Sequence, residues 1–440
     1  MEYSSSSRTK GKWKWKGCVC PLHLVSGLAG FMGCFVLMLC LNYNPNTIRI
    51  LSFRNISITF TSSPAAAKTA LLWASSSQPT HEMKSTNKTH ASFCNIFQGR
   101  WLHKPGEKPL YEDVRCPFLS ERVRCRSNGR PDLDYRSWSW EAEGCQIPRF
   151  NGKDMLERLR GKRLVMVGDS LNRNQWESLA CLLYSVVSPS RAHVDVESGV
   201  YKVFKAKDYN CSVEFHWSPF LVQLDTNPAN GTSVLRLEKV VSSAKQWLGA
   251  DIMVFNTGHW WVHNRNFRAW HLFDYKGRLV EDLELELAFE TAMKTWARWI
   301  DQNVDSTKTA VFFRSVSPEH RGKQWCYNQT KPIMDESFKG SFPEPLMEAL
   351  KRTIRRMKTP VRYMNVTKLS EYRIDAHPAW YGEKRGKLLM ENKEIKQLSA
   401  STDCSHWCLP GLPDTWNRLL YTLLVFDTLG KRTDSSRILE

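Results

Sequence analysis

The chain has 440 residues, about three times the length of a typical domain, which allows one large domain or two to three smaller ones. Hydrophobic residues make up 42% of the chain, aromatic residues 12% and charged residues 24%, a composition that excludes wholesale disorder, a collagen-like chain and a coiled coil. The net charge of +18 would suit a nucleic-acid partner, but the predicted compartment excludes one.

A single membrane anchor is predicted near the N-terminus. Residues 24–41 are 18 consecutive positions without a charge, roughly 27 Å long as a helix and close to the thickness of a bilayer core. Five basic residues and one acidic residue precede them within residues 1–16, so the positive-inside rule predicts a cytosolic tail over residues 1–23 and a lumenal C-terminal part. The alternative is a cleaved signal peptide, but no A-x-A-like site follows the apolar stretch, and we favour the uncleaved anchor.

Sequons and cysteines agree with a lumenal location. N-x-S/T sequons, which are predicted glycosylation sites, occur at Asn55, Asn87, Asn210, Asn230, Asn328 and Asn365. Nine cysteines follow the anchor, and an oxidising lumen would pair most of them and leave one free. No C-x-x-C pair of zinc-finger spacing occurs among these nine cysteines, and His259 and His263 have no obvious third ligand. We therefore expect no metal site.

The part of the chain beyond the anchor divides into a stem and one folded domain. Residues 42–92 are rich in Ser, Thr, Pro, Ala and Asn and show little periodicity, which is typical of a stem. From residue 93 onward aromatic residues and cysteines become dense, and no second low-complexity linker appears. We therefore predict a single catalytic domain over residues 93–440.

Within that domain, short apolar runs alternate with segments of helical periodicity. Strands are predicted at Arg163–Val167, Ile252–Phe255, Thr309–Phe313 and Val361–Asn365, and helices at Asn174–Leu183, Glu281–Ile300, Pro345–Met357 and Trp416–Phe426. Strands that alternate with helices favour an α/β fold with three layers, a parallel sheet covered by helices on both faces. A cysteine-rich extension precedes this core.

Two motifs suggest a nucleophile and its base. Gly168-Asp169-Ser170 follows the first predicted strand, at the sheet edge where functional groups gather in open parallel sheets. A serine hydroxyl needs a base to remove its proton and an acid to orient that base, and Asp403-Cys404-Ser405-His406 supplies both three residues apart. Asp375 and His377 form a rival pair, but their two-residue spacing suits a triad less well.

These motifs and others resemble the plant trichome-birefringence-like proteins. The resemblance extends over most of the predicted domain and is specific at the segments Cys94–Phe97, Gly99–Trp101, Pro109–Tyr111, Cys116–Phe118, Asn128–Asp132, Trp138–Trp140, Gly168–Leu179, Asp403–Gly411 and Asp414–Asn417. That family comprises Golgi polysaccharide O-acetyltransferases with a fold similar to the GDSL/SGNH esterases. The resemblance thus implies an SGNH-hydrolase-like domain, held in the Golgi membrane as a single-pass type II protein.

The resemblance also implies roles for individual residues. Ser170 would be the nucleophile, His406 the general base and Asp403 the acid that orients it. The same resemblance suggests the disulfides Cys94–Cys145, Cys116–Cys181, Cys125–Cys408 and Cys326–Cys404, with Cys211 left free. No tightly bound cofactor is implied. The expected partners are a cell-wall polysaccharide acceptor and an acetyl donor of unknown identity, or a membrane protein that supplies it.

Further candidates concern the oxyanion and the acceptor. The backbone N–H of Ser170 is the natural first oxyanion donor, and Asn256 and Gly258 follow a strand at the same sheet edge. An Asn that ends a strand and a Gly that permits a turn are the alternatives. Arg173 could bind an acidic sugar or pair with Glu177 one helical turn later. Trp260 and Trp261 could stack on sugar rings or lie in the core.

Three functions remain open from the sequence. The first is an acetyltransferase acting on a cell-wall polysaccharide, with xylan ahead of pectin, xyloglucan and mannan. The second is an acetyl esterase with the same triad, in which water replaces the sugar hydroxyl, and the third is a non-catalytic polysaccharide-binding protein. Residues 1–16 carry +4 of the net charge, which leaves +14 beyond them, enough to attract an acidic polymer.

Overall fold

A seven-stranded sheet forms the centre of the folded part. The computed structural model describes residues 94–430, except 197, 263–267, 322–324, 336, 339, 341 and 383–401, with side chains described to residue 426. The strands lie in the order β13 (Val361–Met364), β12 (Ala310–Arg314), β9 (Ile252–Phe255), β3 (Arg163–Gly168), β6 (Cys211–Trp217), β5 (Tyr201–Ala206) and β4 (Ala192–Asp195). The four strands predicted from the sequence lie side by side at one end of this order.

The sheet is mixed, which corrects the prediction of a parallel sheet. The strands from β13 to β6 are parallel, whereas β5 and β4 pair antiparallel with their neighbours. The connection between β5 and β6 is a single short turn, Lys207–Tyr209, closed by Asn210 at a φ of 46°. Since a connection this short joins only antiparallel strands, the tight turn fixes the direction of β5.

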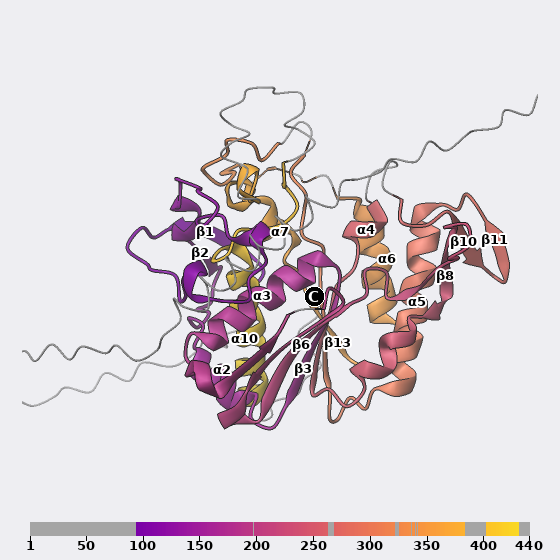
Figure 1. Cartoon of the computed structure of the whole chain (residues 1–440), viewed down its shortest axis with the longest axis horizontal. Helices are drawn as coiled ribbons and strands as arrows, with labels where there is room; N and C mark the ends of the chain where they lie inside the picture. The colour runs from indigo at the N-terminus through magenta and orange to yellow at the C-terminus, as the bar shows by residue number, and fades with distance from the viewer. Residues whose placement is uncertain are drawn as a thin grey trace, which may run out of the picture. The chain divides into compact units, whose positions relative to one another are not determined.

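Helices cover both faces of the sheet, as predicted. The helices α2 (Gly152–Arg158), α3 (Ser170–Tyr184) and α10 (Leu412–Gly430) lie on one side of the strands, and α5 (Leu285–Asn303) and α6 (Glu344–Arg355) lie on the other (Figure 1). Along β3, Leu164 and Met166 point into the first helical layer, and Val165 and Val167 point into the second. This alternation gives the three-layer core its two apolar faces.

Two smaller sheets were not predicted from the sequence. The strands β7 (Val222–Thr226), β8 (Ser233–Val240), β10 (Leu272–Tyr275) and β11 (Arg278–Val280) form a four-stranded sheet whose β8 packs against α5. A hairpin of β1 (Gly99–His103) and β2 (Trp138–Ala142) lies in the N-terminal extension. Two short helices, α4 (His259–Val262) and α7 (Thr367–Glu371), follow β9 and β13.

Within the described residues, four disulfides hold the N-terminal extension and the late loops. Cys94 pairs with Cys145, Cys116 with Cys181, Cys125 with Cys408 and Cys326 with Cys404, as the resemblance implied. Cys211 is free and buried. The Cys116–Cys181 bond ties the extension to α3, and the Cys125–Cys408 bond ties it to the segment before α10, so the extension forms one body with the sheet.

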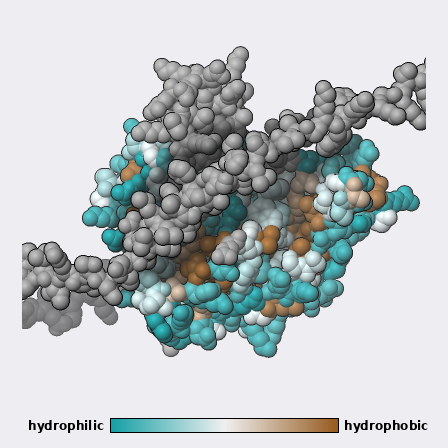
Figure 2. Space-filling view, viewed as in Figure 1, coloured by the Kyte–Doolittle hydropathy of each residue, from teal (hydrophilic) through white to brown (hydrophobic). Residues whose placement is uncertain are grey.

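The predicted cytosolic tail 1–23, anchor 24–41 and stem 42–92 lie outside the described residues. Within the described part, no helix combines the length and the apolar character needed to cross a bilayer. On the face seen in Figure 2 the described residues are mainly hydrophilic, with smaller hydrophobic patches. The sequons Asn55 and Asn87 are not described, and the other four lie at exposed asparagines, Asn210, Asn230, Asn328 and Asn365. Their glycosylation stays a prediction.

Candidate active site

Ser170 lies at the junction between the central strand β3 and helix α3. Gly168 ends β3 so close to β9 that a Cβ there would lie 2.5 Å from the carbonyl oxygen of Asn256. Asp169 caps α3 by accepting a hydrogen bond from the backbone N–H of Leu171 at 2.9 Å. Ser170 therefore begins the helix, and its N–H belongs to the first turn, whose N–H groups have no partner within the helix.

Asp403 and His406 form a direct acid–imidazole pair on one turn. The Nδ1 atom of His406 lies 2.9 Å from Oδ2 and 3.1 Å from Oδ1 of Asp403. The backbone N–H groups of Ser405 and His406 donate to the same Oδ1 atom. This arrangement places the proton of the neutral ring on Nδ1 and leaves the Nε2 lone pair free to accept another proton.

The surroundings keep Asp403 ionised. Burial alone would raise the pKa of Asp403, but the ring and the backbone N–H of His406, together with Arg122, outweigh it and hold the pKa well below its usual value. The Nε of Arg122 lies 3.6 Å from Oδ2. Among the described residues, the Nε2 atom of His406 is buried without a hydrogen-bond partner. An ionised acid and a free ring nitrogen are the states that a general base requires.

Asn174 attaches the segment of His406 to the first turns of α3. Its Oδ1 accepts from the backbone N–H of Trp407 at 2.8 Å, and its Nδ2 donates to the carbonyl of Trp407 at 3.2 Å. Ser170 and Asn174 are four residues apart on α3 and so share one helix face. The structure therefore brings the residue next to His406 onto the face of α3 that carries Ser170. Sequence reasoning missed Asn174, although its spacing from Ser170 was a usable signal.

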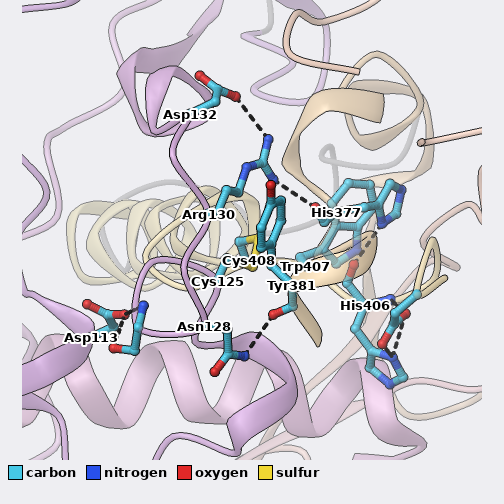
Figure 3. The surroundings of a disulfide bond; sticks show 12 residues. Asp113, Cys125, Asn128, Arg130, Asp132, His377, Tyr381, His406, Trp407 and Cys408 are labelled. Carbon is cyan, nitrogen blue, oxygen red and sulfur yellow. Dashed lines mark hydrogen bonds and ion pairs between the residues drawn. A yellow bond between two sulfur atoms is a disulfide. The ribbon is translucent and has the colours of Figure 1, made fainter. Parts of the chain in front are cut away.

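Further contacts fix the segment that carries Asp403 and His406. Ala379 and Asp403 exchange backbone hydrogen bonds, and both Cys404 and Cys408 are in disulfides. The indole of Trp407 stacks on the ring of His377, with centroids 3.8 Å apart, near the Cys125–Cys408 bond (Figure 3). The base is therefore held from several sides by residues distant in sequence.

Comparison with known proteins identifies the family. Residues 147–423 match the PC-Esterase model, a GDSL/SGNH-like acyl-esterase family found in Pmr5 and Cas1p, and residues 92–146 match the PMR5 N-terminal domain. Trichome birefringence-like protein 3 of Arabidopsis thaliana is 43% identical over 74% of this chain and 78% of its own length, and trichome birefringence-like protein 4 is 40% identical over 86% of each chain. The chain belongs to the trichome birefringence-like family.

A rice relative in the same family carries a more specific name. The probable xylan O-acetyltransferase 8 of Oryza sativa subsp. japonica is 41% identical over 76% of this chain and 78% of its own length. The boundary between the two family models, at residues 146 and 147, falls between the disulfide-bonded N-terminal extension and the helix α2. The family resemblance noted from the sequence is thereby confirmed.

The oxyanion candidates of this trichome birefringence-like protein gather at the edge that holds Ser170. Asn256 follows β9, and its Nδ2 donates one hydrogen bond, to the carbonyl of Arg314 at 3.3 Å, which leaves its second N–H for another acceptor. Gly258 has a φ of 140°, and a Cβ there would lie 2.2 Å from the Val316 side chain. Both residues thus have a structural function, and their part in oxyanion binding stays a prediction.

The acceptor candidates differ in exposure. Trp261 is 2% exposed, its Nε1 donates to Thr257, and aromatic rings surround it. A sugar could not reach this ring, so we drop Trp261 from the acceptor-binding residues. Trp260 is half-buried, and Arg173 lies 4.0 Å from Glu177, the helical ion pair weighed as its alternative.

The rival acid–imidazole pair is not a catalytic dyad. Asp375 binds the guanidinium of Arg373 at 2.9 and 3.0 Å, and the Nδ1 of His377 faces the carbonyl oxygen of His406 at 2.7 Å. Of the weighed metal-ligand pair, His259 is buried at the start of α4, and His263 lies outside the described residues. Asp375 therefore stabilises the fold, and His377 contacts the backbone of the base.

Asp414, at the start of α10, joins three parts of the domain. It accepts from Tyr111 of the N-terminal extension at 2.9 Å, from Ser178 of α3 at 2.5 Å and from the backbone N–H of Gly411 at 2.9 Å. Burial raises the pKa of Asp414 to about 6, although all three donors act to lower it. This carboxyl group is therefore sensitive to pH near neutrality.

Proposed function

We propose that this protein is a polysaccharide O-acetyltransferase that carries the acetyl group on Ser170. The observation that supports this most strongly is the Asp403–His406 pair, which Asn174 attaches to the helix face of Ser170. The membership in a GDSL/SGNH-like acyl-esterase family supports the same acyl chemistry. The proposed acceptor is a plant cell-wall polysaccharide, with xylan first and pectin, xyloglucan and mannan behind it.

The first half-reaction loads the enzyme. His406 Nε2 takes the proton from Ser170 Oγ as that oxygen attacks the carbonyl carbon of the acetyl donor. The negative charge that develops on the carbonyl oxygen is stabilised by the backbone N–H of Ser170, with Asn256 and Gly258 as the proposed further donors. The bond between the acetyl carbon and the leaving group then breaks, the leaving group takes the proton from His406, and acetyl-Ser170 remains.

The second half-reaction transfers the acetyl group. A sugar hydroxyl takes the place of the leaving group, His406 Nε2 removes its proton, and the sugar oxygen attacks the acetyl carbon. The same N–H donors stabilise the second oxyanion. As it collapses, Ser170 Oγ leaves and recovers its proton from His406, so that the enzyme returns to its starting state. Asp403 stays ionised and stabilises the imidazolium in both halves.

An aromatic hollow beside the catalytic segment supports a glycan acceptor. It has a volume of about 570 Å³, and its lining includes Trp325, Tyr327, Gln329 and Lys331. Trp325 and Tyr327 flank Cys326, whose disulfide with Cys404 adjoins Asp403. Half-buried aromatic rings suit the C–H faces of sugars, and the amide and the ammonium group suit hydroxyl and carboxylate groups. Because one relative is named a probable xylan O-acetyltransferase, we propose xylan ahead of the other acceptors.

The proposed location is the Golgi membrane, with the catalytic domain in the lumen and a single anchor at residues 24–41. Four disulfides in the described domain favour an oxidising compartment. Retention by an anchor in the secretory pathway favours synthesis of acetylated polymer over its degradation. The acetyl donor, or a membrane protein that supplies it, is the proposed partner on the donor side.

The experiment compares the full-length chain with two serine variants, one at the first residue of α3 and one at its C-cap. The chain is produced in a secretory host, incubated with an acetyl donor and deacetylated oligosaccharides of xylan, pectin, xyloglucan and mannan, and added acetyl groups are read by mass spectrometry. Ser170→Ala should abolish transfer, whereas Ser185→Ala, at the exposed end of α3, should retain it. Ser170-dependent deacetylation without transfer would identify an esterase, and glycan binding with neither activity a binding protein.

A further inference from the structure

Two buried histidines link a backbone carbonyl of α7 to the backbone carbonyl of the catalytic base. The Nε2 of His320 lies 2.9 Å from the carbonyl oxygen of Glu371, and its Nδ1 lies 2.7 Å from Nε2 of His377. The Nδ1 of His377 lies 2.7 Å from the carbonyl oxygen of His406. His320 is 2% exposed and His377 is 1% exposed. We call these three contacts the histidine relay.

The relay needs more protons than two neutral rings possess. A carbonyl oxygen only accepts, so the contact with Glu371 requires N–H at Nε2 of His320 and the contact with His406 requires N–H at Nδ1 of His377. The central contact joins the two remaining nitrogens, and at 2.7 Å it requires a third N–H between them. Two neutral imidazoles carry two N–H groups in total. All three contacts are hydrogen bonds only when the pair holds one extra proton.

We infer that His320 and His377 are positioning residues of the reaction, which share one extra proton and thereby hold the carbonyl of His406 in place. This inference rests on the proposed function in taking His406 as the base. Loss of the shared proton removes one of the three hydrogen bonds. The relay then either releases the carbonyl of His406 or separates from its support at Glu371, and the base loses part of its fixed orientation.

The stacking of His377 on Trp407 supports a positive charge on the pair. The ring planes are 24° apart and the centroids 3.8 Å, a geometry in which the indole face attracts a cation. Trp407 is the residue that Asn174 holds, and its Nε1 donates to Ser317 at 2.7 Å. Trp407 is therefore held through its backbone by Asn174 and through its indole by Ser317, and it connects the relay to the helix of Ser170.

Some of the groups around the relay lower the pKa values of His320 and His377, and others raise them. Burial lowers the pKa of His320 to about 4 and that of His377 well below its usual value, and positive charge on His320 and on His406 lowers the pKa of His377 further. Glu319 and Asp403 raise the pKa of the pair, as do the carbonyl contacts. Arg130 donates to the carbonyl of His377 and adds a positive charge nearby, and Arg373 and Asp375 neutralise each other. These lowered pKa values by themselves would leave the pair neutral at pH 7, but the three short contacts together require the extra proton, and the central N–H···N bond, which exists only in the protonated pair, favours its retention.

Two substitutions of His320 distinguish an effect of the shared proton from an effect of side-chain packing alone. A glutamine amide has two N–H groups, so His320→Gln can donate to Glu371 and to a neutral His377 without an extra proton. His320→Leu can make neither bond. The measurement is the rate of acetyl transfer by the full-length chain from about pH 5 to 9, the range in which histidines titrate.

For the wild type we expect activity to fall on the alkaline side as the relay loses its proton. His320→Gln should lack this alkaline fall, and His320→Leu should lose about 10- to 100-fold in kcat at every pH because the base is misplaced. If the wild type and His320→Gln showed the same fall in activity at alkaline pH, the inference of a shared proton would be overturned.

A second measurement needs no variant and no activity. In the wild-type chain labelled with 15N-histidine, NMR at neutral pH should show three protonated ring nitrogens in the His320–His377 pair. Two protonated nitrogens would overturn the inference even if acetyl transfer is found. Three protonated nitrogens without any acetyl transfer would support the relay and count against the proposed function, so the two failures are distinguishable.

Discussion

The nucleophile and the base are positioned by different kinds of structure. Ser170 lies where a buried central strand turns into a helix, and its backbone is positioned by β3 and α3, which are contiguous in sequence, between the neighbouring strands β9 and β6. Asp403 and His406 lie in a segment without regular structure. Two disulfides, a backbone bridge to Ala379 and the two hydrogen bonds between Asn174 and Trp407, which we call the Asn174 clamp, hold this segment in place. Local folding places the nucleophile, and long-range cross-links place the base. Changes near Ser170 should therefore affect the fold, and changes around His406 should affect the geometry of the site.

The largest effect is expected where the acid loses its charge. Asp403→Asn keeps the size of the side chain but no longer fixes the tautomer of His406 or stabilises the imidazolium, so acetyl transfer should fall about 10⁴-fold. Asp305→Asn, an exposed loop position, is the matched control and should transfer at the wild-type rate. A loss of less than tenfold in Asp403→Asn would mean that this carboxylate does not orient the base.

Removal of individual disulfides should separate the two regions. The double variants Cys326→Ala/Cys404→Ala and Cys94→Ala/Cys145→Ala should each lower the free energy of unfolding by about 2 to 5 kcal/mol. Only the first bond adjoins Asp403, so only the first variant should also lose activity at temperatures where it remains folded. Equal specific activity of the two folded variants would contradict the account of the catalytic segment.

The pH dependence of stability should reveal Asp414. Its pKa in the folded state, about 6, lies above the unfolded value, so the native state binds the proton more tightly. The stabilisation is complete below the unfolded pKa and is lost as pH rises through about 6. Relative to Asp414→Asn, the wild type should thus lose up to about 3 kcal/mol of unfolding free energy between about pH 4 and 7. If denaturant titrations gave the same difference in unfolding free energy between the wild type and Asp414→Asn at both pH values, the raised pKa of Asp414 would be contradicted.

The Asn174 clamp should affect rate more than stability. Asn174→Ala removes both hydrogen bonds to Trp407, and the resulting displacement of His406 should lower kcat about 10- to 100-fold. Asn174→Asp keeps the acceptor oxygen but loses the N–H donor, so its kcat should lie between those of the wild type and of Asn174→Ala. Steady-state kinetics would test this against Asn303→Ala, an exposed helix-end asparagine. A change in KM alone would show that the clamp does not position the base.

The smallest effect is expected in the aromatic hollow. Trp325→Ala removes one ring of the proposed sugar contact, and the KM for oligosaccharide should rise about three- to tenfold, more than any change in kcat. Trp299→Ala, another half-buried tryptophan, which packs on Trp247, is the control for loss of packing. An unchanged KM in Trp325→Ala would place the acceptor elsewhere.

The core and the triad candidates could be predicted because their signals are local. The strands β3, β9 and β12 contain continuous apolar runs, β13 is a short run interrupted only by Arg362, and the acid and the imidazole of Asp403–His406 are three residues apart. The strands β4, β5 and β6 were missed because polar residues interrupt their apolar runs. The four-stranded sheet was missed because its strands likewise lack a continuous apolar run.

Contacts between distant segments could not be predicted from residue patterns. Nothing in the sequence around Asn174 indicates Trp407, and His320 and His377 are 57 residues apart. The disulfide pairing followed from the family resemblance, since spacing alone leaves it open. The same distinction explains Trp261, whose sequence context suits a sugar contact but whose ring is enclosed by Phe220 and Trp270 of two loops and by Phe289 of α5.

The most direct test of the central claim is the detection of acetyl-Ser170. The full-length chain is mixed with an activated acetyl ester without acceptor, quenched with acid, digested, and the peptide that contains Ser170 is sequenced by mass spectrometry. We expect one added acetyl group on Ser170, which disappears when oligosaccharide is added before the quench and which does not form in His406→Ala. Acetyl transfer to the glycan with Ser170 never acetylated, or equal transfer by Ser170→Ala, would contradict the account.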